Sequence, residues 1–421
     1  MMKKTLLALA VLGAAAGTAA AANVQLYGVL DYGLKYTNTK ADTGASSVDK
    51  FEMATGNQSG PRFGLLGSEE LGNGLKVGFV LENGFSADDG KLGNNGRLFG
   101  RTAEIYLEGD FGKLIAGREG QLTSYNGTVG LIGGLSPFGA SWCGSPEVST
   151  FFVGNSRIDN SLTYVTPSFA GLKLYAQYSF DMNTKEDSTM TLAEAERTST
   201  TTGGVTTWAH DTNDYKQTEG KTTANRYAAI GASYNAGNLN LALVADWYNW
   251  SSNYAGSQLN GRQDLDDGFS VTAGGNYNFG VAKAYIGAQY FDNMIKTTTA
   301  DDDTKDTFVK VGTGISGQVK GYGLIIGADA PVLGGTAMIA AGYTSTEEAN
   351  LAADVQKTES DRWGVGYTYN LSKRTNLYGV AAYYRDSVKN ERVETATSAD
   401  ITIRDRDPSA TTLVVGIRHK F

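Results

Sequence analysis

Residues 24–36 read Val24-Gln25-Leu26-Tyr27-Gly28-Val29-Leu30-Asp31-Tyr32-Gly33-Leu34-Lys35-Tyr36, and this stretch decides the fold class. One face of the extended chain carries Val24, Leu26, Gly28, Leu30, Tyr32, Leu34 and Tyr36. The opposite face is mostly polar and includes Gln25, Asp31 and Lys35. Apolar and polar faces that alternate with a period of two are typical of a β-strand. The same alternation returns at 74–85 and at 412–421, so the sequence predicts an all-β fold.

The composition suits strands better than helices. The 421 residues include 54 glycines and 23 tyrosines but only 6 prolines and one cysteine, so no internal disulfide can form. Abundant glycine and aromatic residues fit strands that twist, bend and close. Beyond the amino-terminal segment, no apolar stretch reaches the roughly 20 residues that a membrane-spanning helix needs. Any crossing of a membrane would therefore be made by strands.

The amino terminus has the pattern of a secretory signal peptide. Lys3 and Lys4 precede an apolar run over 6–16, and small residues follow it. A transmembrane anchor is the alternative, but it needs about 20 apolar residues, and this run is shorter. We predict a signal peptide at 1–22 and a mature chain at 23–421. Without the two lysines the formal net charge changes from −8 to −10, and such an acidic chain is no candidate for nucleic acid.

Short turns and long polar loops alternate along the mature chain, which separates a membrane barrel from a soluble β-sandwich with similar strands. Seven connections are brief or carry turn residues, at 71–74, 109–112, 168–170, 235–238, 278–280, 331–335 and 370–375. Eight stretches are long and rich in Asp, Thr, Asn and Ser, at 37–59, 86–97, 119–155, 182–223, 251–265, 292–305, 346–360 and 387–410. Together they predict a transmembrane antiparallel β-barrel of about sixteen strands, the first and last of which pair.

Five blocks of sequence, at 24–31, 62–76, 81–85, 109–118 and 157–164, stand out together with the final Phe421. Together they resemble Gram-negative general porins of the β-proteobacterial type. The resemblance implies a homotrimer of sixteen-stranded barrels in the cell outer membrane and one porin domain over 23–421. It also implies contact with membrane lipid and lipopolysaccharide, and recognition of Phe421 by the outer-membrane assembly machinery.

The resemblance further implies a constriction inside the barrel. It places loop 119–155 in the lumen and arginines on the wall at Arg62, Arg101 and Arg157, with Arg118 as a weaker fourth candidate. Strand parity separately directs Arg62 inward, because its neighbour Phe63 is of the lipid-facing type.

The acidic side of this constriction is less defined. The run Leu135-Ser136-Pro137-Phe138-Gly139 lacks the glutamate that many porins carry between the proline and the phenylalanine. The candidates are therefore Glu119 and Glu147. If Arg101 points inward, simple alternation would turn Glu104 and Glu108 outward, where a protein interface or the aqueous ends of the strand could accommodate them.

These features predict a water-filled channel for passive diffusion of small hydrophilic solutes and ions. The alternative is a substrate-specific channel for sugars or carboxylates. No catalytic residue is predicted, because His210 lies in a predicted external loop and His419 lies at the opposite end of the last strand. The glycine pattern at 312–317 lacks the βαβ context of a dinucleotide site, and the aspartates at 264–267 lack EF-hand spacing. Neither a cofactor nor a metal site is predicted.

Overall fold

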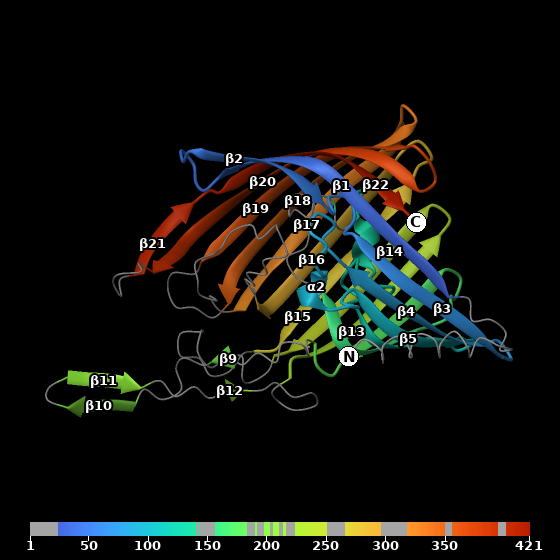
Figure 1. The fold of residues 1–421 in the computed structure, drawn as a ribbon, viewed down its shortest axis with the longest axis horizontal. Helices are drawn as coiled ribbons and strands as arrows, with labels where there is room; N and C mark the ends of the chain where they lie inside the picture. Colours follow the sequence, from blue (N-terminus) through green and yellow to red (C-terminus); the bar gives the residue numbers. More distant parts are fainter. Residues whose placement is uncertain are drawn as a thin grey trace, which may run out of the picture.

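The structure is a computed structural model that describes residues 24–139, 142, 156–182, 190–191, 198–202, 205–209, 214–215, 224–250, 266–295, 318–349, 356–394 and 401–421. Its main feature is one sheet of eighteen strands that closes on itself (Figure 1). The first eight are β1 (Gln25–Lys40), β2 (Ser47–Thr55), β3 (Arg62–Gly72), β4 (Leu75–Gly84), β5 (Thr102–Gly109), β6 (Gly112–Gly120), β7 (Arg157–Val165) and β8 (Leu172–Ser179). The others are β13 (Arg226–Ala236), β14 (Leu239–Asn249), β15 (Gly268–Asn278), β16 (Lys283–Ile295), β17 (Gln318–Val332), β18 (Gly335–Ala349), β19 (Lys357–Asn370), β20 (Thr375–Glu394), β21 (Ile401–Arg406) and β22 (Ser409–Lys420).

Several short elements do not belong to the barrel wall. They are α2 (Gly93–Gly96), η1 (Ile132–Leu135), β9 (Met190–Thr191), β10 (Thr198–Thr202), β11 (Val205–Ala209) and β12 (Asp214–Tyr215). β10 pairs with β11 and β9 pairs with β12, forming two small sheets that lie apart from the wall in Figure 1. Within the described ranges, no helix is both long and apolar enough to cross a membrane.

Two barrel strands are each interrupted once. β2 and β3 pair with successive parts of β1, at 32–40 and at 25–29. β21 and β22 likewise pair with successive parts of β20. With each interrupted strand counted once, the described residues form sixteen antiparallel barrel strands. β22 pairs with β1, with Tyr32 opposite Ile417, so the wall has no free edge. The predicted sixteen-stranded antiparallel barrel is confirmed.

The short connections follow the chemistry of their turn residues. Asn73 and Gly74 join β3 to β4, and their φ angles are 52° and 75°. Positive φ at both central positions is the requirement of a type I′ hairpin turn, which asparagine and glycine meet at little cost. The twist of that turn matches the twist of the strands beside it. The turn predicted at 71–74 therefore forms as expected.

The two faces of the wall differ as the alternation predicted. On β1, Leu26 and Leu34 are 64 % and 48 % exposed, whereas Asp31 and Lys35 are buried on the opposite face. Other strands repeat this arrangement, with large apolar side chains on the exposed outer face and polar side chains inside. An apolar outer band around a polar interior is the arrangement that allows a barrel to stand in hydrocarbon.

The stretch predicted as a loop at 37–59 is mostly paired strand. β1 and β2 extend into it and leave only 41–46 as their connection. Polar side chains support this hairpin, because Oδ1 of Asp49 accepts hydrogen bonds from Tyr36 (2.6 Å) and Asn38 (2.7 Å). Composition was misleading here because polar cross-strand pairs can stabilise a ladder as apolar pairs do.

The chain after β6 runs along the inner face of the wall. Leu122 lies in an apolar cluster with Tyr227 of β13. Farther along, Phe138 and Trp142 lie in a second apolar cluster with Tyr378 of β20. Both tyrosines belong to the buried inner face of their strands. The described part of the third long loop, residues 121–139 and Trp142, therefore lies inside the barrel, and we call it the inner segment.

Candidate functional site

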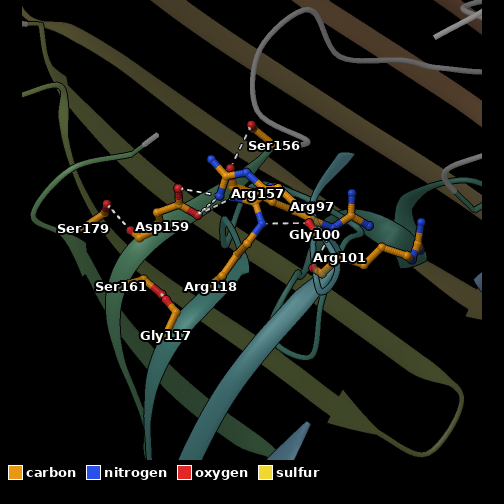
Figure 2. Close-up of polar contacts among 10 residues, drawn as sticks. All are labelled: Arg97, Gly100, Arg101, Gly117, Arg118, Ser156, Arg157, Asp159, Ser161 and Ser179. Atoms are coloured by element: carbon orange, nitrogen blue, oxygen red, sulfur yellow. Dashed lines mark hydrogen bonds and ion pairs between the residues drawn. The ribbon is translucent and has the colours of Figure 1, made fainter. Parts of the chain in front are cut away.

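Five arginine side chains gather on one part of the inner wall, and we call them the arginine cluster. Arg62 begins β3, Arg97 and Arg101 lie between β4 and β5, Arg118 lies near the end of β6, and Arg157 begins β7. Figure 2 shows all of them except Arg62. The side chains of Arg62, Arg97, Arg101 and Arg118 remain 24 %, 17 %, 16 % and 16 % exposed. The cluster is thus held by its neighbours and still reaches the space inside the barrel.

Glu82 of β4 joins two of these arginines. Its Oε1 lies 2.6 Å from Nε of Arg101 and 3.9 Å from Nη1 of Arg62. Its Oε2 accepts a hydrogen bond of 2.9 Å from the hydroxyl of Tyr27. In the ladder, Arg62 is opposite Gly84, so Glu82 lies two residues farther along and on the same face. Strand register therefore brings this carboxylate to the arginines.

Asp159 of β7 joins another two (Figure 2). Nη1 of Arg97 donates to both of its carboxylate oxygens, at 2.8 Å and 2.7 Å. Nη1 of Arg118 donates to Oδ1 of the same carboxylate, and its Nε donates to the carbonyl oxygen of Gly100 at 2.7 Å. Charge-assisted hydrogen bonds of this kind are stronger than neutral ones. Both guanidinium groups are thus fixed in direction.

Arg157 is held by neutral acceptors. Its Nε donates to the carbonyl oxygen of Arg101, and its Nη2 donates to Oδ1 of Asn126, both at 2.8 Å. Asn126 belongs to the segment inside the barrel, so Arg157 connects the wall to that segment. Across the residues that the structure describes, Arg157 forms no ion pair with a carboxylate. Its positive charge is therefore not neutralised by a direct partner there.

The cluster carries an excess of positive charge. Four guanidinium groups contact two carboxylates, Glu82 and Asp159, and the fifth, that of Arg157, is held by neutral acceptors. An arginine side chain stays protonated under all ordinary conditions. Charges of one sign along a narrow aqueous space between low-dielectric walls focus the electric field and attract ions of the opposite sign. The arrangement can therefore attract anions and the negative ends of dipolar solutes.

The structure brings four of the predicted residues together: Arg62, Arg101, Arg118 and Arg157. Sequence analysis did not single out Arg97, Glu82 or Asp159. Asp159 could have been found, because it lies two residues after Arg157 and so shares its face of the strand. Glu82 could also have been found on the polar face of its strand. Nothing local indicates Arg97, because it lies in a connection and only the fold brings it to β7.

Glu119 does not lie with the arginine cluster. It is fully buried, and its Oε1 accepts hydrogen bonds from the backbone N–H groups of Gly120 (2.8 Å) and Thr128 (2.6 Å). The hydroxyl of Thr128 lies 3.2 Å from its Oε2 and also 3.2 Å from the carboxylate of Glu104. Glu119 thus fastens the start of the inner segment and is removed from solvent. The other acidic candidate, Glu147, lies outside the described residues.

The expectation that Glu104 turns outward when Arg101 points inward is wrong. Glu104 is only 4 % exposed and contacts the inner segment, whereas its neighbour Ile105 is 58 % exposed on the outer face. Arg101 also points inward, because it lies before β5, where the chain bends and its N–H donates to the carbonyl oxygen of Glu82 at 3.1 Å. Alternation applies only within a regular strand, so it cannot be extended from Arg101 to Glu104.

The inner segment is fastened to the wall by polar contacts at several strands. Gln177 of β8 accepts the N–H of Leu122 at 3.0 Å, and Asn276 of β15 donates to the carbonyl oxygen of Gly134 at 2.8 Å. Asp246 of β14 accepts a hydrogen bond from the hydroxyl of Thr123. Because buried polar groups are costly when unpaired, these contacts favour one position of the segment.

A closed antiparallel barrel with an apolar outer band and a charged, polar interior defines the class of transmembrane β-barrel channels. A model of the Gram-negative porin family matches residues 8–389, and the chain belongs to that family. It is an outer-membrane porin, which forms a water-filled channel for passive diffusion of small hydrophilic solutes and is not an enzyme. The family, the location and the function predicted from the sequence are confirmed.

Relatives along the whole chain carry porin names. The chain is 30 % identical to an outer membrane porin protein of Bordetella pertussis, with 100 % of both chains covered. It is 28 % identical to outer membrane porin protein 32 of Delftia acidovorans, again with 100 % of both chains covered. A monosaccharide porin of Halomonas sp is 26 % identical, with 91 % of this chain and 95 % of the relative covered.

Solved structures share the fold. An anion-selective porin from Comamonas acidovorans superposes with a TM-score of 0.58 at 24 % identity, covering 95 % of this chain and 100 % of that one. The trimer form of OmpT, an outer membrane protein of Vibrio cholerae, superposes with a TM-score of 0.52 at 13 % identity and the same coverage. At these identities the likeness concerns the fold.

Proposed function

We propose that the arginine cluster and the inner segment form the constriction of a general diffusion pore that favours anions. The observation that carries this proposal is the excess of five guanidinium groups over two contacting carboxylates, including Arg157, which lacks an ion-pair partner among the described residues. A solute passing between wall and segment would meet fixed positive charges, so chloride and small anionic metabolites would pass more readily than cations of equal size.

The overall charge of the chain argues in the opposite direction. The formal charge of −8, or −10 without the two amino-terminal lysines, would favour cations if every charge acted equally. At about 0.15 M salt, however, the Debye length is about 8 Å, so charges on distant external loops are largely screened. The charges that line the passage therefore dominate its selectivity.

Replacing three of the cluster arginines tests the proposal. We expect the triple variant Arg62→Ser, Arg101→Ser, Arg157→Ser to raise single-channel conductance, because three long side chains leave the passage. We also expect its reversal potential in a salt gradient across a planar bilayer to move toward cations.

The matched control removes three positive charges outside the lumen, through Arg374→Ser, Arg385→Ser and Lys389→Ser. Arg374 is exposed in a short connection, and the other two are 52 % exposed at the side-chain level. This control is expected to keep the parent's reversal potential. Equal reversal potentials and conductances in the parent and the lumen variant would refute the proposed constriction.

A substrate-specific channel is the second candidate, favoured by the relative named monosaccharide porin. The two candidates differ in how current responds to solute. Saturable block by one class of sugar or carboxylate would support a specific binding site in the pore. Ohmic current that falls only with the size of the added solute would support the general pore that we propose.

We also propose that the protein assembles as a homotrimer in contact with lipid and lipopolysaccharide, and that residues 1–22 are removed on export. The trimer form of the similarly folded OmpT supports the assembly. Native mass spectrometry in mild detergent is expected to detect trimers with an amino terminus near residue 23. Monomers alone, or a mature chain that retains Lys3 and Lys4, would contradict the corresponding part.

A further inference from the structure

The interruption between β2 and β3 places a short piece of chain inside the barrel. Residues 56–61 leave the wall there, and Asn57, Gln58 and Ser59 are only 2 %, 7 % and 9 % exposed. Nδ2 of Asn376 donates to the side chain of Gln58 at 2.8 Å, on the inner face of β20. We call residues 56–61 the inner bulge. It was not expected from the sequence, which placed most of it in an external loop.

Asp31 of β1 holds the inner bulge. This carboxylate is fully buried, and its Oδ2 accepts the backbone N–H groups of Gln58 (2.7 Å) and Ser59 (2.6 Å). Its backbone carbonyl oxygen accepts the N–H of Gly56 at 3.0 Å. A carboxylate that receives two backbone N–H groups in this way defines the path of the peptide that donates them.

The other carboxylate oxygen of Asp31, Oδ1, is connected to the inner segment through Tyr378. The hydroxyl of Tyr378 donates to Oδ1 of Asp31. The ring of Tyr378 in turn packs edge-on against Trp142, with 5.6 Å between ring centroids and an interplanar angle of 80°. Trp142 packs edge-on against Phe138 at the same centroid distance. One carboxylate therefore connects the inner bulge with Trp142 and Phe138, at the end of the described part of the inner segment.

The inner bulge also contacts the arginine cluster. Gly60 faces Arg101 so closely that a Cβ on it would lie 3.3 Å from Nη1 of that arginine. The next residues are Pro61 and Arg62, so the end of the bulge determines where β3 begins and where Arg62 enters the lumen. The bulge thus contacts Arg101 and leads directly into Arg62.

We propose that Asp31 is a positioning residue for selectivity, which fixes the arginine cluster and the inner segment relative to each other through the inner bulge and Tyr378. The inference rests on the proposed constriction, and it adds a residue that itself carries the wrong charge for anion attraction. An asparagine at this position would present one oxygen and one NH₂ group, so it could not accept all the hydrogen bonds that the carboxylate accepts. The bulge and the ring of Tyr378 would then lose their common support.

The sign of the effect separates positioning from simple electrostatics. Loss of a negative charge from the lumen by Asp31→Asn would by itself move selectivity toward anions. Loss of positioning would let Arg101 and the inner segment move, so anion preference would fall and the open-channel current would become noisier. We therefore expect Asp31→Asn, measured in planar bilayers with the full-length mature protein, to lose anion preference and to gain current noise.

Asp329→Asn is the matched control. Asp329 lies on the inner face of β17 and accepts a hydrogen bond from the hydroxyl of Tyr285, so it repeats the aspartate–tyrosine pair elsewhere in the lumen. Among the described contacts it does not join the inner bulge or the inner segment. This control is expected to keep the low noise of the parent and to keep or increase its anion preference, because it removes a lumenal negative charge without loss of positioning.

Tyr378→Phe extends the test in case Asp31→Asn does not assemble. It removes one oxygen atom and keeps the ring that packs on Trp142. It is expected to change noise and selectivity in the same direction as Asp31→Asn, and the double variant is expected to add little, because both changes break one connection.

Two results would overturn the inference. One is noise and selectivity equal to those of the parent in both single variants, Tyr378→Phe and Asp31→Asn. The other is a shift of Asp31→Asn toward anions without added noise. If either occurs while the triple arginine variant still shifts toward cations, the proposed constriction stands and only the role of Asp31 fails. If the arginine variant also shows no shift, both fail.

Discussion

At the scale of single residues, the charge of a side chain does not by itself reveal its role. Glu119 and Asp31 are acidic residues in a lumen with excess positive charge, yet both are fully buried and accept backbone N–H groups. Glu82 and Asp159, by contrast, contact guanidinium groups of the arginine cluster. Burial and hydrogen-bond partners therefore separate carboxylates that hold backbone from carboxylates that orient arginines.

Glu119→Ala tests whether the Glu119 carboxylate stabilises the fold by accepting backbone N–H groups. The change leaves the N–H groups of Gly120 and Thr128 without their acceptor in a buried place. Each unsatisfied donor costs about 1–3 kcal/mol, so the free energy of unfolding from urea titrations in detergent should fall by at least that amount. The control Glu108→Ala removes an exposed pair with Lys76 (3.8 Å) and should cost less than about 1 kcal/mol. Equal losses in both variants would show that Glu119 is not a structural acceptor.

At the scale of elements, the inner segment differs from a free loop because the wall supplies its partners. Asp246 of β14 is fully buried and accepts hydrogen bonds from three hydroxyl groups, those of Thr123, Tyr227 and Ser270. One donor belongs to the segment and two belong to neighbouring strands. The segment is therefore joined to a network that the barrel forms by itself, and its position follows from the barrel.

Asp246→Ala should release the segment at this point. Three buried hydroxyl groups lose their acceptor, at about 1–3 kcal/mol each where no water replaces it. We expect a lower free energy of unfolding and larger fluctuations of the open-channel current. Asp361→Ala, on an exposed position of β19, serves as control and should leave both unchanged. Open-channel current fluctuations in Asp246→Ala that equal those of the parent would mean that other contacts suffice to hold the segment.

At the scale of the whole molecule, the barrel is closed by its first and last strands, β1 and β22. The N–H of Phe421 donates to the carbonyl oxygen of Gly28, and the N–H of Gly28 donates to that of Phe421, both at 3.1 Å. The ring of Phe421 lies over Gly28, where any Cβ would overlap it. The final residue thus completes the seam between β1 and β22 on the outer face.

Deletion of Phe421 should therefore reduce the amount of heat-modifiable trimer in outer membranes sharply. The variant loses the last ladder pair at the seam, and it loses the terminal aromatic residue that we propose the assembly machinery reads. Phe421→Tyr keeps the ring and both backbone bonds, so it should assemble at nearly the parental level. Parental amounts of trimer after the deletion would show that neither the seam pair nor a terminal signal depends on this residue.

The sequence by itself determined the wall of this protein. Alternation with a period of two, turn residues such as Asn73-Gly74 and the alternation of short and long connections are local features, and local features suffice to predict sixteen strands and to direct Arg62 inward. The contents of the lumen were decided by the tertiary structure. Asp31 meets Tyr378 across 347 residues, and Arg97 meets Asp159 across 62. Such partners are chosen by barrel closure and by the path of the inner segment, so no pattern along the chain could reveal the inner bulge or the burial of Glu119.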